Sequence, residues 1–342
     1  MMLRYAGYMS GSDPTSIRPM RIVIPGGSGL VGQLLARRFQ ERGHHVIVLT
    51  RGPYTAAWQT VHWDGKSLGP WVETLEGADV CINLAGRSVN CRYTPRHRQE
   101  IYVSRIQSTR LVGRAIAGLQ DPPRAWLNAS TATIYRHALD RDMDEATGEL
   151  GGYETVSRSH PAPDTWNFSV QVARDWESEL FQVSTPRTRK IALRTSIVFS
   201  PTRGSAFAIF TRLVRVGLGG TQGSGRQYVS WIHESDFASA IEFLVNHEEI
   251  DGPVNLAAPN PLPNREFMEA FRDAWEMPNG LWAPAPILEI GSFFLRTESE
   301  LVLKSRRVIP GHLLDAGYEF EFPTWPEAAK DLVRQWRTRN LD

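Results

Sequence analysis

A glycine-rich turn near the start of the chain constrains the fold more than any other segment. Residues 22–24 form an apolar run that predicts a strand, and apolar residues at every fourth position predict a helix at residues 30–42. Gly27, Gly29 and Gly32 between them have the spacing G-x-G-x-x-G, and Gly26 adds the spacing G-x-x-G-x-x-G. In a strand–turn–helix unit these glycines let the backbone approach a pyrophosphate at the helix N-terminus.

We therefore predict a dinucleotide-binding turn rather than a turn whose glycines serve only helix–sheet packing. The residues expected to contact the cofactor are Gly26, Ser28, Gly29, Leu30, Val31 and Gly32.

Strand-like and helix-like segments alternate through the first 200 residues. Apolar runs predict strands at residues 22–24, 46–49, 60–63, 80–84, 125–130 and 191–199, and helical periodicity predicts helices at 30–42, 95–119 and 166–181. This alternation predicts an α/β fold with a doubly wound parallel sheet of the Rossmann type. We expect a cofactor domain at residues 20–200 and a smaller substrate lobe at 201–342, with a helical module from about residue 285. The chain is also expected to return to the sheet after residue 200.

Bulk properties exclude several classes of protein. The 342 residues carry a formal net charge of +1, which argues against a general role on nucleic acids or membrane surfaces. Only two cysteines are present, so we expect no disulfide framework and a reducing, cytoplasmic compartment. No apolar run approaches the ~20 residues of a membrane span. Residues 1–19 lack a signal-peptide pattern and are expected to be an extended start or a disordered leader; the alternative is an ordered arm that packs on the domain. The histidines show no metal-ligand spacing.

The end of the second predicted strand indicates which dinucleotide binds. NAD-binding versions of this fold place an Asp or Glu there to bind the adenosine ribose. This chain has Thr50 and Arg51 instead, so no carboxylate repels a 2′-phosphate and a guanidinium can pair with it. We therefore expect NADP(H) in preference to NAD(H); the alternative is that Arg51 is a solvated loop residue.

A second wall of the cofactor site is expected where further strands end, because open parallel sheets bind ligands at the carboxyl ends of their strands. The fourth strand ends in Asn83, Leu84, Ala85 and Gly86, and small residues there leave room for the adenosine. Ser130 and Thr195, at the ends of the next two strands, are also expected to contact the cofactor.

Taken together, several motifs resemble the extended short-chain dehydrogenases/reductases, and more closely their atypical sugar-nucleotide-epimerase-like branch. The motifs are the glycine turn, Asn83–Gly86, the segment 130–135, the loop 217–227 followed by Trp231-Ile232-His233, and the segments 252–261 and 305–318. The resemblance covers residues 21–335 and implies a Rossmann-type domain, a C-terminal lobe and NADP(H). It fixes no reaction.

Ordinary members of this superfamily use a Tyr-x-x-x-Lys pair for proton transfer. This chain has nine tyrosines and four lysines, and no lysine follows a tyrosine at that spacing. The expected positions hold Ser169 and Ala173, which cannot replace the pair. The resemblance implies Thr131 as a substitute, since it stands near the superfamily's catalytic Ser or Thr. Tyr135 is a second candidate, although the branch usually has Tyr-Tyr-Gly where this chain has Ile-Tyr-Arg.

Other polar residues have both functional and structural interpretations. Arg226 lies in a glycine-rich loop and is a candidate for binding a phosphate or carboxylate of the substrate. His233 and Asp236 resemble a proton relay, but in the superfamily this motif mainly positions a helix. The arginines between residues 92 and 114 are interrupted by Glu100, so a solvated helix face is expected rather than a polyanion site.

Our first hypothesis is an NADP(H)-dependent oxidoreductase that acts on a small carbonyl or phosphorylated substrate, as a monomer or homodimer. The absent Tyr-x-x-x-Lys pair leaves two alternatives open. One is an NADP(H)-binding sensor or regulatory protein with little turnover, and the other is a sugar-nucleotide epimerase. Neither a nucleic-acid nor a membrane partner is expected.

Overall fold

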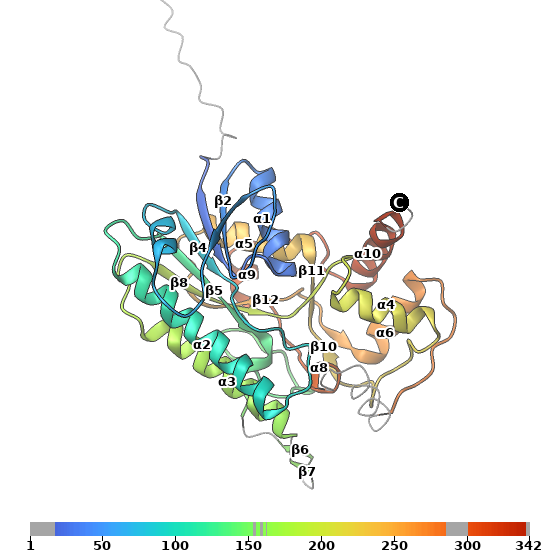
Figure 1. The fold of residues 1–342 in the computed structure, drawn as a ribbon. Coiled ribbons are helices and arrows are strands. Elements are labelled where there is room, and N and C mark those ends of the chain that lie inside the picture. The colour runs from blue at the N-terminus through green and yellow to red at the C-terminus, as the bar shows by residue number, and fades with distance from the viewer. Residues whose placement is uncertain (1–17, 153–154, 158–159, 162, 285–299, 340–342) are drawn as a thin grey trace, which may run out of the picture.

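A seven-stranded parallel sheet forms the centre of the protein in the computed structural model, which describes residues 18–152, 155–157, 160–161, 163–284 and 300–339 (Figure 1). The strand order is β12-β8-β5-β4-β1-β2-β3. The strands are β1 (Arg21–Pro25), β2 (His45–Thr50), β3 (Gln59–His62), β4 (Val80–Asn83), β5 (Ala125–Thr131), β8 (Arg189–Thr195) and β12 (Gly252–Leu256). The predicted doubly wound α/β fold is confirmed.

Helices cover both faces of this sheet, because its strands alternate apolar side chains between the two faces. On one face α1 (Leu30–Glu41) and α5 (Glu234–Asn246) pack on a cluster that includes Ile22 and Ile24. On the other face α2 (Pro95–Ala117) and α3 (Asp164–Gln182) lie side by side over a cluster that includes Val23 (Figure 1).

A second core lies beside the sheet and unites three helices of the C-terminal part (Figure 1). These are α4 (Ala206–Arg215), α6 (Asn264–Ala274) and α10 (Trp325–Arg339). The Trp325 ring stacks on Phe267 with 4.1 Å between ring centroids, and both side chains are fully buried. The remaining short elements are η1 (Pro70–Thr74), η2 (Ala132–Ile134), β6 (Thr155–Ser157), β7 (His160–Pro161), β9 (Ile197–Phe199), β10 (Tyr228–Val229), β11 (Trp231–His233), β13 (Leu262–Pro263), α8 (Glu300–Leu303) and α9 (Gly311–Asp315).

One feature of this architecture differs from the sequence expectations, and another agrees with them. The strand predicted over residues 191–199 is divided at Ser196, whose backbone N–H and hydroxyl both donate to the Leu256 carbonyl oxygen. As a result β8 belongs to the central sheet, whereas β9 pairs with β11. The chain does return to the sheet after residue 200, since β12 pairs with β8 and forms its edge.

The predicted leader, apart from residues 18 and 19, and residues 285–299 of the predicted helical module lie outside the described residues. None of the described helices combines the length and apolar character that crossing a membrane requires.

Candidate functional site

The glycine turn follows β1, at the point where the strand order of the sheet reverses. The next strand in the chain, β2, pairs with β1 on one side, and β4 pairs with β1 on the other. Gly26 has a φ of +76°, and a Cβ atom there would lie 2.6 Å from the Cα atom of Ala85. Only glycine therefore lets this turn pack against the loop that follows β4. That crevice is where doubly wound sheets bind their ligands.

The N-terminus of α1 is left open for an anion. Gly29 is its N-cap residue, so no side chain caps the first turn, and the first turn holds no acidic residue. Gly32 packs directly on the turn, because a Cβ atom there would lie 2.4 Å from the Gly27 Cα atom. Gly29 itself is exposed, and Ser28, Leu30 and Val31 are partly exposed. This arrangement fits a dinucleotide pyrophosphate.

The end of β2 reaches the same turn. The Thr50 hydroxyl lies 3.4 Å from the Ser28 Oγ atom, and Arg51 begins an exposed loop. Arg37, an exposed residue of α1 that the sequence analysis did not single out, lies near this loop. Burial raises the pKa of Tyr54 in the loop, while the positive charge of Arg37 opposes that rise. Two guanidinium groups therefore stand on this side of the glycine turn.

The Asn83 side chain lies inside the protein, behind the second wall of the predicted cofactor site, and does not face a ligand. It is fully buried, donates to the Asn128 Oδ1 atom at 2.7 Å and accepts from the Ala85 N–H at 3.2 Å. These bonds fix the loop Leu84–Ala85–Gly86 at the crevice. The site thus contains the predicted loop, with Asn83 as the residue that orients it.

Further along the same edge of the sheet, β5 and β8 end at a cavity of about 280 Å³. Five parts of the chain line it, and the residues are Val89, Tyr93, Ile101 and Arg105; Ser130, Thr131, Ala132 and Thr133; Phe168, Ser169, Val172 and Trp176; Thr195, Ser196 and Ile197; and Glu300 and Arg306. A ligand that extends from the glycine turn across the β4 loop would reach this cavity next.

The hydroxyl groups of the cavity differ in what they can still bind. Thr131 accepts a hydrogen bond from the Thr133 N–H at 3.2 Å, which leaves its own O–H proton to donate. The Ser130 hydroxyl donates to Glu177 at 2.6 Å, and the Thr195 hydroxyl donates to the Leu193 carbonyl at 3.1 Å. Of these three, Thr131 is the one whose proton has no acceptor among the described residues.

Residues far away in the sequence complete the cavity wall. Ser169 donates to Glu300 at 2.6 Å, and Arg306 lies 3.4 Å from the same carboxylate and 3.2 Å from the Thr133 hydroxyl. Tyr93 contacts Ser169, and burial, with the charge of Glu300 as a smaller cause, raises the pKa of Tyr93 to about 12. No spacing in the sequence connects Tyr93, Glu300 and Arg306 with the predicted site.

Two predicted site residues do not reach the cavity. Tyr135 is 1% exposed, and its hydroxyl donates to Asn255 at 2.9 Å and accepts from Arg194 at 2.8 Å. The Tyr135 hydroxyl is therefore hydrogen-bonded within the protein interior. The tyrosine that lines the cavity is Tyr93. Arg226 lies on an exposed loop, and its side chain does not line the cavity.

His233 and Asp236 have the structural role that the resemblance implied. The His233 Nδ1 atom accepts from the Ser235 N–H and so caps α5. The Asp236 carboxylate accepts from the backbone N–H groups of Glu321 and Phe322 at 2.7 and 2.9 Å. Asp236 therefore fixes the C-terminal part to α5, and His233 fixes the start of that helix.

One arginine of α2 departs from the predicted solvated face. Arg105 is only partly exposed, lines the cavity and lies over the Trp176 ring, with 5.0 Å between its Cζ atom and the ring centroid. By contrast, Arg110 is exposed and pairs with Glu179.

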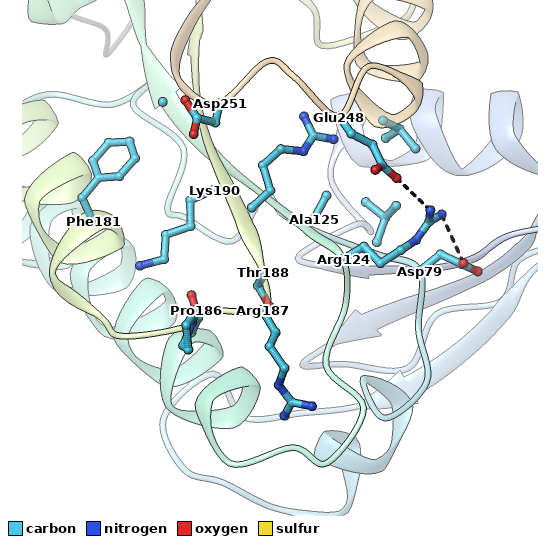
Figure 2. Close-up of a pocket in the computed structure, with 15 residues that line it drawn as sticks. Asp79, Arg124, Ala125, Phe181, Pro186, Arg187, Thr188, Lys190, Glu248 and Asp251 are labelled. Carbon is cyan, nitrogen blue, oxygen red and sulfur yellow. Dashed lines mark hydrogen bonds and ion pairs between the residues drawn. The ribbon is translucent and has the colours of Figure 1, made fainter.

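A larger hollow of about 850 Å³ lies at the opposite, amino-terminal edge of the sheet (Figure 2). Its basic side chains are used by the fold. Arg124 lies between Asp79 and Glu248 and pairs with both (Figure 2). Arg187 and Lys190 donate to carbonyl oxygens just beyond the C-terminal ends of α2 and α3, where a cation is favourable. This hollow therefore offers no comparable catalytic arrangement.

Comparisons with known proteins agree with the fold. The chain is 30% identical over 314 residues to an epimerase family protein of Staphylococcus epidermidis, which covers 92% of this chain and 99% of the relative. The human epimerase family protein SDR39U1, solved with NADPH, superposes with a TM-score of 0.79 at 27% identity, covering 92% of this chain and 99% of that one. A nucleoside-diphosphate sugar epimerase from Corynebacterium glutamicum gives a TM-score of 0.70 at 26% identity, covering 95% of this chain and 62% of that one.

Two family models match the sequence. Residues 283–332 match a domain of unknown function. Residues 22–257 match the NAD dependent epimerase/dehydratase family, to which the chain therefore belongs.

Proposed function

We propose that the protein is an NADP(H)-dependent oxidoreductase that reduces a small carbonyl compound. The observation that carries this proposal is that the glycine turn and the cavity lie at the same edge of the sheet, where its parallel strands end. An open glycine turn at the α1 N-terminus suits a pyrophosphate, and the hydroxyl-lined cavity at the ends of β5 and β8 suits a small substrate. The human relative solved with NADPH supports the choice of cofactor class.

Arg51 and Arg37 are the residues that would select NADP(H). Both are exposed near the end of β2, and Thr50 stands where an NAD-binding protein has its carboxylate. A 2′-phosphate between two guanidinium groups gains charge-assisted hydrogen bonds that the 2′-hydroxyl of NAD(H) does not.

A fluorescence titration with NADPH and NADH tests this selection. Wild type is expected to bind NADPH at least about 10-fold more tightly than NADH, and Arg51→Ala and Arg37→Ala should each reduce that ratio. Arg114→Ala, an exposed arginine of α2, is the matched control and should leave the ratio unchanged. Equal affinity of the wild type for both dinucleotides would contradict the proposal.

The cavity residues can guide the chemistry of a reduction. When bound, the dinucleotide supplies a hydride to a carbonyl carbon. The Thr131 hydroxyl, whose proton is available, hydrogen-bonds the carbonyl oxygen and orients it. Tyr93 keeps its proton at neutral pH because burial holds its pKa at about 12, and it gives that proton to the oxygen as the alcohol forms. Water then reprotonates the Tyr93 phenolate.

Two variants test these roles. Tyr93→Phe should lower kcat for carbonyl reduction by about 100-fold, the usual scale for lost acid–base assistance. Thr131→Val removes one hydrogen bond to the carbonyl oxygen and should lower kcat by about 10-fold. The Kd for NADPH should not change, because neither side chain lies at the glycine turn. Unchanged kcat in both variants would overturn the assignment.

A second candidate is an NADP(H)-binding protein with little turnover. Ser169 lines the cavity at the expected position of the superfamily's tyrosine, and the buried Ala173 occupies the position of its lysine. Wild-type protein that binds NADPH but consumes none with any member of a carbonyl library would favour this candidate. Interconversion of a sugar nucleotide without net cofactor change would instead indicate an epimerase.

A further inference from the structure

Arg105 is held rigidly at the edge of the substrate cavity. A Cβ atom on Gly86 would lie 3.5 Å from the Arg105 Cγ and Cζ atoms, so the side chain passes directly beneath the β4 loop. Its guanidinium then lies over the Trp176 ring of α3. The side chain is therefore enclosed between two elements that also line or border the cavity.

The hydrogen bonds of this guanidinium leave one edge unused. Its Nη1 atom donates to the backbone carbonyl oxygens of Arg87, at 3.0 Å, and Ile101, at 3.1 Å. The Nε and Nη2 atoms have no hydrogen-bond partner in the described part of the chain. They are not among the unpartnered polar atoms that are fully buried, so each keeps some exposed surface. Nε–H and Nη2–H form the parallel fork with which arginine binds two oxygens at once.

The charge of Arg105 is also uncompensated. Arg306, the other cation of the cavity, lies 3.4 Å from the Glu300 carboxylate. Within the described ranges no Asp or Glu side chain pairs with Arg105. Burial lowers the pKa of Arg105 to about 10, so the group is still charged at neutral pH. The lining residues thus carry one positive charge in excess, which favours an anionic ligand.

We propose that Arg105 binds a carboxylate of the substrate through its Nε/Nη2 edge, so that the protein acts on small carbonyl compounds that carry a carboxylate. A cavity of about 280 Å³ limits the substrate to a small molecule. The Thr131 hydroxyl then hydrogen-bonds the carbonyl oxygen of the same molecule. This inference rests on the proposed function, because it names the substrate class of the same cavity.

Binding of oxamate, a small carboxylate that is not reduced, tests the proposal without turnover. The NADPH-loaded protein is titrated with oxamate by calorimetry, in wild type and in Arg105→Met, Arg105→Lys and Arg110→Met. Saturable binding is expected in wild type, with a Kd raised at least about 10-fold in both Arg105 variants, since lysine lacks the fork. Arg110→Met removes an exposed arginine of the same helix and should bind like wild type.

Three results would overturn the proposal. One is oxamate binding that is absent in wild type, or equal in wild type and the Arg105 variants. A second is preference for inorganic phosphate over oxamate, lost in the same variants, which would assign the fork to a phosphate group. A third is a weaker Kd for NADPH in Arg105→Lys, which would make Arg105 a cofactor ligand. Arg105→Lys decides these outcomes if Arg105→Met does not fold.

A turnover experiment separates this inference from the proposed function. Wild type should consume NADPH with a 2-oxo acid at least about 10-fold faster, in kcat/KM, than with its uncharged methyl ester. Faster reduction of the ester would overturn the inference and leave the oxidoreductase proposal intact. Absence of NADPH binding would instead contradict the proposed function itself.

Discussion

Arg194 and Glu177 form a two-bond ion pair next to Ser130, which lines the cavity at the ends of β5 and β8. Nε and Nη2 of Arg194 donate to the two carboxylate oxygens of Glu177 at 2.9 and 2.7 Å, and both side chains are at most 10% exposed. Burial alone would lower the pKa of the Arg194 guanidinium, but the hydrogen bonds and charge of Glu177 outweigh it and raise that pKa. The pair also anchors Ser130, which donates to Glu177 at 2.6 Å.

Replacing one partner of this pair should destabilise the protein strongly. Glu177→Gln leaves the buried Arg194 without a counter-charge, and we expect the free energy of unfolding to fall by about 3 kcal/mol or more. Urea denaturation measures this. Glu179→Gln, on the same helix, breaks a solvent-facing pair with Arg110 and should cost less than about 1 kcal/mol. Equal losses in the two variants would contradict this account.

Close packing at Gly26 should matter more than its backbone conformation. Gly26→Ala places a Cβ atom 2.6 Å from the Ala85 Cα atom and should abolish NADPH binding, because the turn and the β4 loop must separate. Gly43 has a similar φ of +81°, but nothing lies within 4 Å of a Cβ atom there. Gly43→Ala should therefore cost only about 1 kcal/mol and retain binding. If both variants bind NADPH like wild type, the crevice is not the cofactor site.

Tyr135 is expected to contribute to stability and not to catalysis. Tyr135→Phe removes the hydroxyl that joins Arg194 to Asn255, and the unpaired buried groups should cost about 1–3 kcal/mol in unfolding free energy. The kcat for NADPH-dependent reduction should remain within about two-fold of wild type, far from the effect that lost acid catalysis produces. A large loss of kcat at unchanged stability would contradict this prediction and indicate that Tyr135 takes part in catalysis.

His233 should make stability depend on pH. Burial lowers its pKa from 6.5 to about 4, against the opposing charge of Asp331, and its neutral Nδ1 atom caps α5. The unfolded chain therefore takes up this proton first as the pH falls. The stabilisation is complete above pH 6.5 and is lost toward pH 4, with a slope of at most about 1.4 kcal/mol per pH unit.

His233→Asn separates this contribution from those of other groups. Asparagine can still cap the helix but does not titrate. Urea denaturation at a series of pH values between 4 and 7 should give a flatter profile for the variant than for wild type. Identical slopes would show that His233 takes up its proton alike in the folded and unfolded states.

Local patterns predicted the sheet well because their causes are local. The run Val46-Ile47-Val48 is buried on both faces of a parallel strand, and the turn glycines are required by contacts within and next to one strand–helix unit. The division of residues 191–199 could not be predicted in this way. It depends on the Leu256 carbonyl, which binds Ser196 from a strand much later in the chain.

The cavity was less predictable than the glycine turn for the same reason. Ser169 and Glu300 come together only through the tertiary fold, and no periodicity connects them. Arg105 falls among other arginines of α2 that Glu100 interrupts, and in a chain of nearly zero net charge this pattern predicted a solvated face. Its burial is caused by Gly86 and Trp176, which belong to other elements.

The position of β12 has a consequence for how the chain must fold. This strand pairs in parallel with β8 and is the outermost strand of the sheet on that side. While a ribosome is still making the segment between them, the unpaired N–H and C=O groups along that edge of β8 can pair with another chain. Non-local parallel pairing of this kind forms slowly. Nascent chains interrupted shortly after β8 should therefore be the species most prone to aggregate.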